Sequence, residues 1–301
     1  MRVLVTGANG LVGSRLTALL ARRGHQVTGF GLGPQRVAGS FDYVSLDLAD
    51  DVALASQVLA VRPEAILNPA AMTDVDACET AAAKAFKVNG VGPGVLALAA
   101  NELGAHLVQI STDYVFDGEA GPYGEEAIPN PRGVYALSKH IGEQAVRALG
   151  SSWAIARTAV VYGWPAAGRP NFGSWLLGAL QKGEPVRLFE DQFVSPSLAD
   201  NVAEQLVDLT ERRLTGFWNV CGAEVVSRVQ FGHALCNEFG LEASSIIPAR
   251  LAEAKPKSPR PLRTGLRTDK ASAQLSIRPL SLTASLARFH QAVNDSQGAR
   301  T

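Results

Sequence analysis

Short apolar runs alternate with longer helical stretches over the first 160 residues, and this alternation constrains the fold more than any other feature. Strands joined through helices need crossover connections, which produce a parallel sheet covered by helices on both faces. We therefore predict an α/β fold with a doubly wound parallel sheet. The pattern predicts strands at 2–5, 26–30, 43–46, 65–68, 106–111 and 153–158, and helices at 11–23, 51–61, 81–103 and 134–149.

Three glycines separate the first predicted strand from the first predicted helix. Gly7, Gly10 and Gly13 permit a tight turn and close approach of the backbone to a pyrophosphate, and the helix N-terminus offers free N–H groups. Their spacing departs from the usual fingerprint, but the strand before them and the helix after them favour a Rossmann-type dinucleotide site. The expected cofactor contacts from this turn are Gly7, Asn9, Gly10, Leu11, Val12 and Gly13.

The end of the second predicted strand bears on the choice between NAD and NADP. An NAD site usually places an acidic residue there, but segment 30–33 contains no Asp or Glu. We therefore expect NADP, with NAD as the alternative. Arg36 is either a partner of the 2′-phosphate or a solvated loop arginine. Asp47, near the end of the third strand, could reach the adenine or simply form a turn.

Beyond residue 160 the alternation loosens, and loops rich in Pro and Arg interrupt it. We expect a dinucleotide-binding domain over residues 1–160 and a smaller, mixed C-terminal substrate-binding lobe over residues 161–301. The boundary between them is expected to be interleaved. The helical runs predicted in this second lobe are 172–180, 198–211, 229–239 and 282–293.

A tyrosine and a lysine stand four residues apart in the predicted helix 134–149, so they share one helix face. The phenol of Tyr135 would ordinarily titrate near pH ~10, and the ammonium group of Lys139 would favour the phenolate and lower that pKa. This spacing is common by chance. Behind a glycine-rich turn and the pair Ser111 and Thr112, it indicates acid–base catalysis.

Composition narrows the class of protein. The 28 basic and 28 acidic residues balance and form no long charge run, which argues against a nucleic-acid or membrane-surface binder. Cys78, Cys221 and Cys236 lack the spacing of metal ligands, so we expect reduced thiols and no metal site. Thr6 and Gly7 break the first apolar run, so we expect no signal peptide, no membrane span and a cytoplasmic protein. A homodimer is compatible with these features.

The motifs resemble those of the extended short-chain dehydrogenase/reductase family and, within it, the dTDP-4-dehydrorhamnose reductases. The matching stretches follow the family order over nearly the whole chain, and the Ser-Thr-Asp-Tyr-Val-Phe run is the most specific of them. They are the glycine turn, 68–71, Asn89, 111–118, 135–139, 142–143, 157–158, 162–163, 171–172, 191–192, 195–196 and 260–261.

This resemblance implies reduction of a 4-keto group on a nucleotide-diphosphate sugar. Tyr135 would donate the proton to the ketone oxygen and Thr112 would hold that oxygen in place. Lys139 would lower the pKa of Tyr135 and bind the nicotinamide ribose. Asn89 would fix a water or a backbone kink that completes a proton relay. The implied cofactor contacts beyond the glycine turn are Arg36, Asp47, Leu48, Ala70, Ala71, Ser111, Tyr135 and Lys139.

The substrate contacts are expected on both lobes. A diphosphate needs cations, for which Arg260 and Arg263 are candidates, and the base or sugar needs amide groups. Asp76 and Glu79 are interpreted as a helix capping box rather than a catalytic pair. The expected substrate contacts are Thr112, Asp113, Tyr135, Val160, Asn171, Gln192 and Arg260.

Departures from the family pattern leave the sugar open. Val160 stands where the family usually has a tryptophan, so the pocket wall is smaller. Asp113 is followed by Tyr114, whereas dehydratases of this fold carry an Asp-Glu pair. Two alternatives to a reductase remain: a sugar-nucleotide epimerase, and a non-catalytic partner-binding subunit resembling the β subunit of methionine adenosyltransferase.

Overall fold

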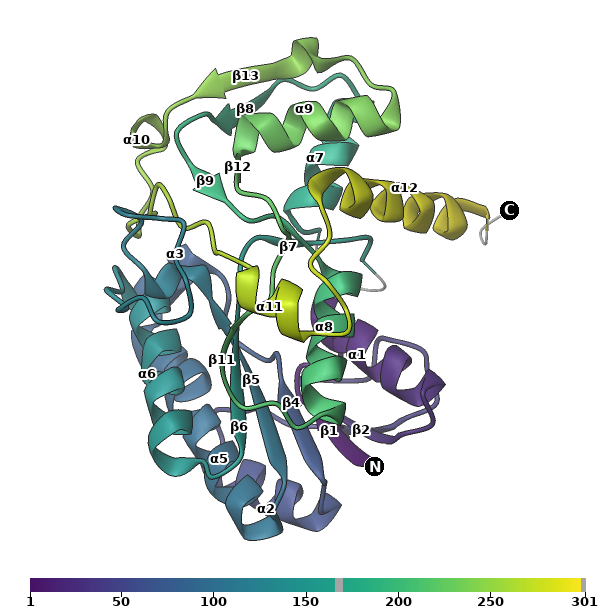
Figure 1. Ribbon diagram of the computed structural model, residues 1–301, viewed down its shortest axis with the longest axis vertical. Helices are drawn as coiled ribbons and strands as arrows, with labels where there is room; N and C mark the ends of the chain where they lie inside the picture. Colours follow the sequence, from purple (N-terminus) through teal and green to yellow (C-terminus); the bar gives the residue numbers. More distant parts are fainter. Residues whose placement is uncertain (166–169, 299–301) are drawn as a thin grey trace.

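The computed structural model describes residues 1–165 and 170–298 and is shown in Figure 1. Its centre is a seven-stranded sheet in the order β11-β6-β5-β4-β1-β2-β3, and every neighbouring pair of strands is parallel. The predicted doubly wound parallel sheet is confirmed. The strands are β1 (Arg2–Val5), β2 (Gln26–Gly31), β3 (Asp42–Ser45), β4 (Ala65–Asn68), β5 (His106–Thr112), β6 (Trp153–Thr158) and β11 (Gly216–Asn219).

Alternate residues of the strands feed two hydrophobic cores, one on each face of the sheet. Val3 and Val5 of β1 point to one core, and Leu4 points to the other. Helices α1 (Leu11–Arg22), α8 (Ala199–Glu211) and α11 (Asp269–Gln274) cover the first core. Helices α2 (Asp51–Val61), α5 (Gly92–Leu103) and α6 (Val134–Leu149) cover the second core.

The single long helix predicted over 81–103 is interrupted. The segment instead contains α4 (Ala82–Ala85), a π-helical turn η1 (Phe86–Val91) and α5, after the short helix α3 (Val75–Thr80). Pro93 has no N–H to donate to the carbonyl of Asn89, four residues earlier, which favours the wider turn. A Cβ on Gly142 of α6 would lie 2.2 Å from that same carbonyl oxygen, so α6 packs directly on the π turn.

The second lobe combines parallel and antiparallel pairs, as expected of a mixed lobe. Strand β8 (Val186–Phe189) pairs in parallel with β13 (Ile246–Ala249), and β7 (Val161–Tyr162) with β10 (Ser197–Leu198), whereas β9 (Phe193–Val194) and β12 (Val226–Ser227) are antiparallel. Tyr162, Phe231 and Phe289 lie at the centre of its core. Its helices are α7 (Phe172–Gln181), α9 (Arg228–Phe239), α10 (Leu251–Ala254) and α12 (Leu282–Gly298).

Part of the second half of the chain belongs to the central sheet layer. Strand β11 and helix α8 follow residue 160 in the sequence, yet they complete the central sheet and cover one of its faces (Figure 1). The sheet layer therefore contains parts of both halves of the chain. In the described ranges, none of the helices is long and apolar enough to cross a lipid bilayer.

Candidate active site

A cavity of about 750 Å³ lies at the carboxyl ends of β1, β2, β4 and β5. We call it the glycine-turn cavity. It gathers residues predicted from the turn, from the strand ends and from helix α6, which are up to 164 positions apart in the sequence (7 to 171). The predicted site residues that line it are Gly7, Asn9, Gly10, Leu11, Val12, Gly13, Arg36, Asp47, Leu48, Ala70, Ala71, Ser111, Thr112, Tyr135, Lys139, Val160 and Asn171.

The glycine turn is tight because its backbone folds back on itself. Gly7 adopts a φ of +57°, and the N–H of Gly10 donates to its carbonyl oxygen at 2.8 Å. A Cβ on Gly13 would lie only 2.1 Å from that oxygen. Gly10 is the N-cap of α1 and provides no side-chain cap, and Leu11, Val12 and Gly13 of the first helical turn line the cavity. This arrangement fits the phosphates of a dinucleotide.

Asn9 organises the loop after β2. Its amide donates to the Tyr43 hydroxyl at 2.8 Å and accepts from the backbone N–H of Arg36 at 2.8 Å. Arg36 is exposed and lines the cavity, as do Gly31 and Leu32 at the end of β2. The strand end thus presents an arginine and no carboxylate. Asn9 was predicted only as a cofactor contact, and its role as the support of this loop was missed.

Asp47 both forms a turn and lines the glycine-turn cavity. Its Oδ1 accepts from the N–H of Ala49 at 3.0 Å, which is a turn interaction, and the residue also lines the glycine-turn cavity beside Leu48. The turn fixes the carboxylate in place at the cavity wall. Contact with an adenine ring stays a prediction.

Tyr135 and Lys139 lie on the face of α6 that lines the cavity. The ammonium of Lys139 donates to the carbonyl oxygen of Ile110 at 2.6 Å, and burial lowers the pKa of Lys139 to about 8, against an opposing effect of Glu143. Burial raises the pKa of Tyr135 above its ordinary value, and a hydrogen bond with Thr112 opposes this only in part. The predicted lowering of this pKa by Lys139 is not seen in the structure described: the pKa of Tyr135 is raised by desolvation, and Lys139 is not among the groups that shift it.

Thr112 is held from two sides. Its hydroxyl oxygen accepts from the N–H of Tyr114 at 3.2 Å, and its proton is donated to Oδ1 of Asp113 at 3.1 Å. Thr264 donates to the other oxygen of the same carboxylate. Asp113 is 2% exposed and lines neither cavity, so its predicted substrate contact is not supported by its placement. Burial raises the pKa of Asp113 to about 6.

Asn89 lies in the π turn and is buried behind the cavity. Its amide nitrogen donates to the carbonyl of Met72 at 3.0 Å and to the Ser138 hydroxyl at 3.1 Å, and its oxygen accepts from the N–H of Met72 at 2.8 Å. The side chain therefore ties the kinked helix to α6, one residue from Lys139. Its part in a proton relay stays a prediction.

Two further predicted contacts lie at the mouth of the same cavity. Asn171 is the N-cap of α7, where its oxygen accepts from the N–H groups of Ser174 and Gly163 and its amide donates to the Gly163 carbonyl. Its polar atoms are thus used by the backbone. Val160 has a φ of +40°, a strained conformation for a β-branched residue, and its side chain forms part of the wall.

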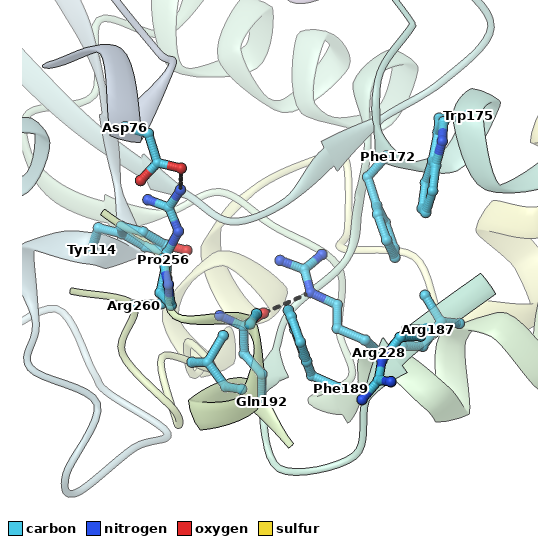
Figure 2. Close-up of a pocket in the computed structure, with 13 residues that line it drawn as sticks. Asp76, Tyr114, Phe172, Trp175, Arg187, Phe189, Gln192, Arg228, Pro256 and Arg260 are labelled. Carbon is cyan, nitrogen blue, oxygen red and sulfur yellow. Dashed lines mark hydrogen bonds and ion pairs between the residues drawn. The ribbon is translucent and has the colours of Figure 1, made fainter. Parts of the chain in front are cut away.

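A second cavity, of about 470 Å³, lies between α3, α7, α9 and the loop after α10. We call it the arginine cavity because Arg187, Arg228 and Arg260 line it. In Figure 2, Arg228 points toward Gln192, to whose side-chain oxygen its Nε donates at 3.0 Å, and it lies 4.6 Å from the Phe172 ring centroid.

Arg260 enters the arginine cavity from the opposite side. Its guanidinium pairs with Asp76 at 3.0 Å, and its Nη1 is buried with no hydrogen-bond partner among the described residues. Gln192 and Arg260 were predicted from the sequence and are brought together here. Arg263 was also a candidate, but it does not line this cavity, and its backbone N–H donates to the Gly118 carbonyl.

The interpretation of Asp76 and Glu79 as a capping box is wrong. Asp74 caps α3 by accepting from the N–H of Ala77 at 2.9 Å. The carboxylates of Asp76 and Glu79 instead contact Ser258, Arg260 and the start of α6. All three partners are distant in the sequence, so local spacing suggested the nearer explanation.

Sequence reasoning also missed Arg228 and the aromatic side chains Phe172 and Trp175 of the arginine cavity. Arg228 is the first residue of α9, directly after the N-cap Ser227, and a single arginine there resembles an ordinary solvated residue. Tyr114 joins the two cavities: it lines the arginine cavity, and its ring meets that of Tyr135 edge-on at 5.9 Å. Only the tertiary structure reveals this continuity.

Together, the parallel sheet, the glycine turn and the cavity at its carboxyl edge define a Rossmann-like α/β protein. The family model of the RmlD substrate binding domain matches residues 1–294. The chain belongs to this family.

Individual relatives cover most of the chain. A probable low-salt glycan biosynthesis reductase of Haloferax volcanii is 33% identical over 298 residues, which are 98% of this chain and 99% of the relative. A dTDP-4-dehydrorhamnose reductase of Streptomyces griseus is 37% identical over 280 residues, 92% of this chain and 83% of the relative. These matches confirm the resemblance inferred from the motifs.

Solved structures agree. The crystal structure of dTDP-4-dehydrorhamnose reductase from Bacillus anthracis in complex with NADP has a TM-score of 0.83 and 27% identity, and the match covers 96% of this chain and 98% of that one. Relatives also include a β subunit of methionine adenosyltransferase 2 from Xenopus tropicalis, which is 31% identical over 255 residues, 82% of this chain and 75% of the relative. The relatives of this chain therefore include both reductases and a subunit of a different enzyme.

Proposed function

We propose that this protein uses NADPH to reduce the 4-keto group of a nucleotide-diphosphate sugar. One observation carries the proposal: Thr112, Tyr135 and Lys139 line the same cavity as the glycine turn. A proton donor and a dinucleotide site in one cavity suit reduction of a ketone. The reductase names of the relatives and the NADP in the Bacillus anthracis structure support the same chemistry.

The chain offers the cofactor a backbone cradle at one end and a cation at the other. The N–H groups at the start of α1 would hold the pyrophosphate, and Lys139 would donate to the ribose hydroxyls. Arg36 would pair with a 2′-phosphate, which favours NADP over NAD. When bound, the dihydronicotinamide supplies a hydride to the ketone carbon.

Tyr135 supplies the proton that balances this hydride on the ketone oxygen. Its phenol is protonated at neutral pH, as a proton donor requires, and burial raises its pKa further. Thr112 would hold the ketone oxygen beside the phenol by turning its hydroxyl proton from Asp113 to that oxygen. Asn89 supports the helix behind them through Ser138. The products are the hydroxyl sugar nucleotide and the oxidised cofactor.

The arginine cavity suits the nucleotide-diphosphate end of the substrate. Arg228 and Arg260 supply positive charge for the diphosphate, and the unpartnered Nη1 of Arg260 has a donor to offer. Phe172 and Trp175 provide flat apolar surface for the base. The sugar would then extend past Tyr114 to Tyr135, with Val160 on the wall of its pocket.

A homodimer is part of the proposal. Leu137 and Ile141 form a short apolar stripe one turn apart on α6; they and Leu149 near the end of the helix are each about two-fifths exposed, and Leu98 of the neighbouring α5 is about half exposed. A second copy meeting this stripe through a two-fold axis would bury it. We further propose that residues 1–160 mainly bind the cofactor and residues 161–301 the substrate. A cytoplasmic location would suit the three buried free cysteines, and the balanced charge of the chain argues against a nucleic-acid partner.

The test is a set of assays with 4-keto sugar nucleotides of different bases and sugars. A reductase consumes NADPH and forms one hydroxyl sugar nucleotide in equal amounts. An epimerase gives an isomer without net consumption, and a partner-binding subunit gives neither product but forms a complex with a methionine adenosyltransferase in light scattering. No consumption with any 4-keto sugar nucleotide, together with such a complex, would reject the reductase proposal.

A further inference from the structure

The N-terminus of helix α6 is not capped by the side chain of its own N-cap residue. Its N-cap, Gly133, has a φ of +84° and no side chain. The first helical N–H, that of Val134, donates at 2.9 Å to Oε1 of Glu79, which lies 55 residues earlier on α3. A carboxylate at this position also interacts favourably with the positive end of the helix dipole. Glu79 therefore caps α6 from another element.

The same carboxylate oxygen has a second partner. The hydroxyl of Ser258 donates to Oε1 of Glu79 at 2.7 Å, and the backbone N–H of Ser258 donates to Oδ1 of Asp76 at 3.0 Å. Ser258 is fully buried. A Cβ on Gly133 would lie 2.6 Å from the Ser258 hydroxyl and 2.8 Å from Oε1 of Glu79. Gly133, Ser258 and Glu79 are therefore packed too closely to admit a side chain at position 133.

Ser258 belongs to the segment that walls the arginine cavity. We call residues 256–263 the cavity loop. Its Pro256 and Arg260 line that cavity together with Asp76, and Arg260 pairs with Asp76. Oε1 of Glu79 thus accepts hydrogen bonds both from a wall of the arginine cavity and from the first turn of the helix that carries Tyr135.

We infer that Glu79 is a positioning residue that couples occupancy of the arginine cavity to the placement of Tyr135. The catalytic role of Tyr135 in this inference rests on the proposed function. The coupling through Glu79 rests only on the contacts described above. A ligand that orders the cavity loop fixes Ser258, Ser258 fixes the Glu79 carboxylate, and Glu79 fixes the first turn of α6. Tyr135 is the second residue of that turn.

The kinetic test compares Glu79→Ala, Glu79→Gln and Ser258→Ala, with Glu102→Ala on the exposed surface of α5 as the matched control. Glu79→Ala should lower kcat roughly 10-fold, the scale of one hydrogen bond to a charged group, with the Kd for NADPH within about twofold of the parent's. Glu79→Gln keeps the acceptor oxygen and should restore most of kcat. Ser258→Ala should mainly raise KM for the sugar nucleotide.

The second arm needs no turnover. Hydrogen exchange is measured with and without a nucleoside diphosphate as the probe, over peptides covering residues 133–140 and 256–263. In the parent and in Glu102→Ala, the probe should slow exchange in both peptides. In Glu79→Ala, it should slow exchange only in 256–263.

The two arms separate the two proposals. A parent that shows coupled exchange but reduces no keto sugar would end the proposed function and leave the coupling intact. Equal slowing of the 133–140 peptide in the parent and in Glu79→Ala would overturn the coupling, whatever the activity. A loss of kcat in Glu79→Ala that Glu79→Gln fails to restore would also count against the coupling. Both variants lack the charge of Glu79, so the loss would then follow the charge and not the acceptor oxygen.

Discussion

The two cavities are built in opposite ways. The glycine-turn cavity is shaped by the backbone turn and the ends of neighbouring strands, where small residues such as Gly7 and Ala70 let the chain segments approach. The arginine cavity is formed by long side chains from separate elements, among them Asp76, Phe172, Arg228 and Arg260. Backbone geometry suits a cofactor that many proteins of one fold have in common, whereas the side chains of a cavity can differ between proteins that bind different substrates. The fold therefore supplies the first site, and the second is supplied by individual residues.

Tyr114 and Tyr135 mark the point where the two cavities meet. Tyr114 lines one cavity and Tyr135 the other, and their rings are in edge-on contact. Substitutions at this junction should affect turnover more than binding of either ligand. Substitutions inside one cavity should affect only the ligand of that cavity. The predictions below test this separation.

The largest effect is expected at the junction. Tyr135→Phe removes the proton donor and keeps the ring, so kcat should fall by roughly 100- to 10,000-fold while the Kd values for NADPH and for a sugar nucleotide stay near the parent's. Stopped-flow measurement of NADPH oxidation, with binding measured by calorimetry, checks both halves. Turnover equal to the parent's would remove Tyr135 from the mechanism.

The next effect concerns the buried carboxylate behind the junction. The pKa of Asp113 is raised to about 6 from an ordinary value of 3.8, because burial disfavours the charged form more than Thr112, Thr264 and Arg228 favour it. A raised carboxylate pKa means that the folded state binds more protons than the unfolded state between those values. The contribution of Asp113 to stability should therefore decrease as pH rises from about 4 to 6, by up to about 3 kcal/mol.

Denaturant unfolding of the parent and of Asp113→Asn at several pH values measures this contribution. The amide does not titrate, so the unfolding free energy of the parent should fall relative to that of Asp113→Asn as pH rises through this window. Titration of other carboxylates cancels in the difference. A difference that is constant with pH would show that Asp113 titrates normally.

The sequence predicted the backbone-built part of the molecule well because its signals are local. Apolar runs with β-strand length, glycines at the start of α1 and the four-residue spacing of Tyr135 and Lys139 are visible within short windows. The structure forms the sheet from these runs and places the glycines, Tyr135 and Lys139 around one cavity at its carboxyl edge. The break in the helix at η1 was missed, because its cause is the packing of α6 at Gly142 and a single proline.

The side-chain-built part was predicted less well because its partners are distant in the chain. Asp76 and Glu79 were given a local capping role, although their partners lie some 180 residues away. Arg228 was not recognised at all. Lys139 was expected to lower the pKa of Tyr135, whereas burial raises it, and burial is a property of the folded structure. Each error replaced a tertiary interaction with the nearest local one.

The third effect is expected within the arginine cavity. Arg228→Ala and Arg260→Ala should each raise KM for the sugar nucleotide roughly 10- to 100-fold, the scale of a charge-assisted contact with a diphosphate, and leave the Kd for NADPH unchanged. Arg250→Ala is the matched control, because Arg250 is 73% exposed, pairs with Glu190 and does not line the cavity. Weaker NADPH binding in Arg228→Ala or Arg260→Ala would show that the two cavities are not separate.

The smallest effect is expected within the glycine-turn cavity. Arg36→Ala should weaken NADPH binding about 10-fold or less, because Arg36 is exposed and its ion pair with a 2′-phosphate would be screened by solvent. NADH binding and KM for the sugar nucleotide should not change, and Arg22→Ala, on the exposed end of α1, serves as the control. Fluorescence titration with both cofactors measures the ratio. If NADPH and NADH bind equally to the parent, and Arg36→Ala changes neither affinity, the 2′-phosphate is not recognised at the end of β2.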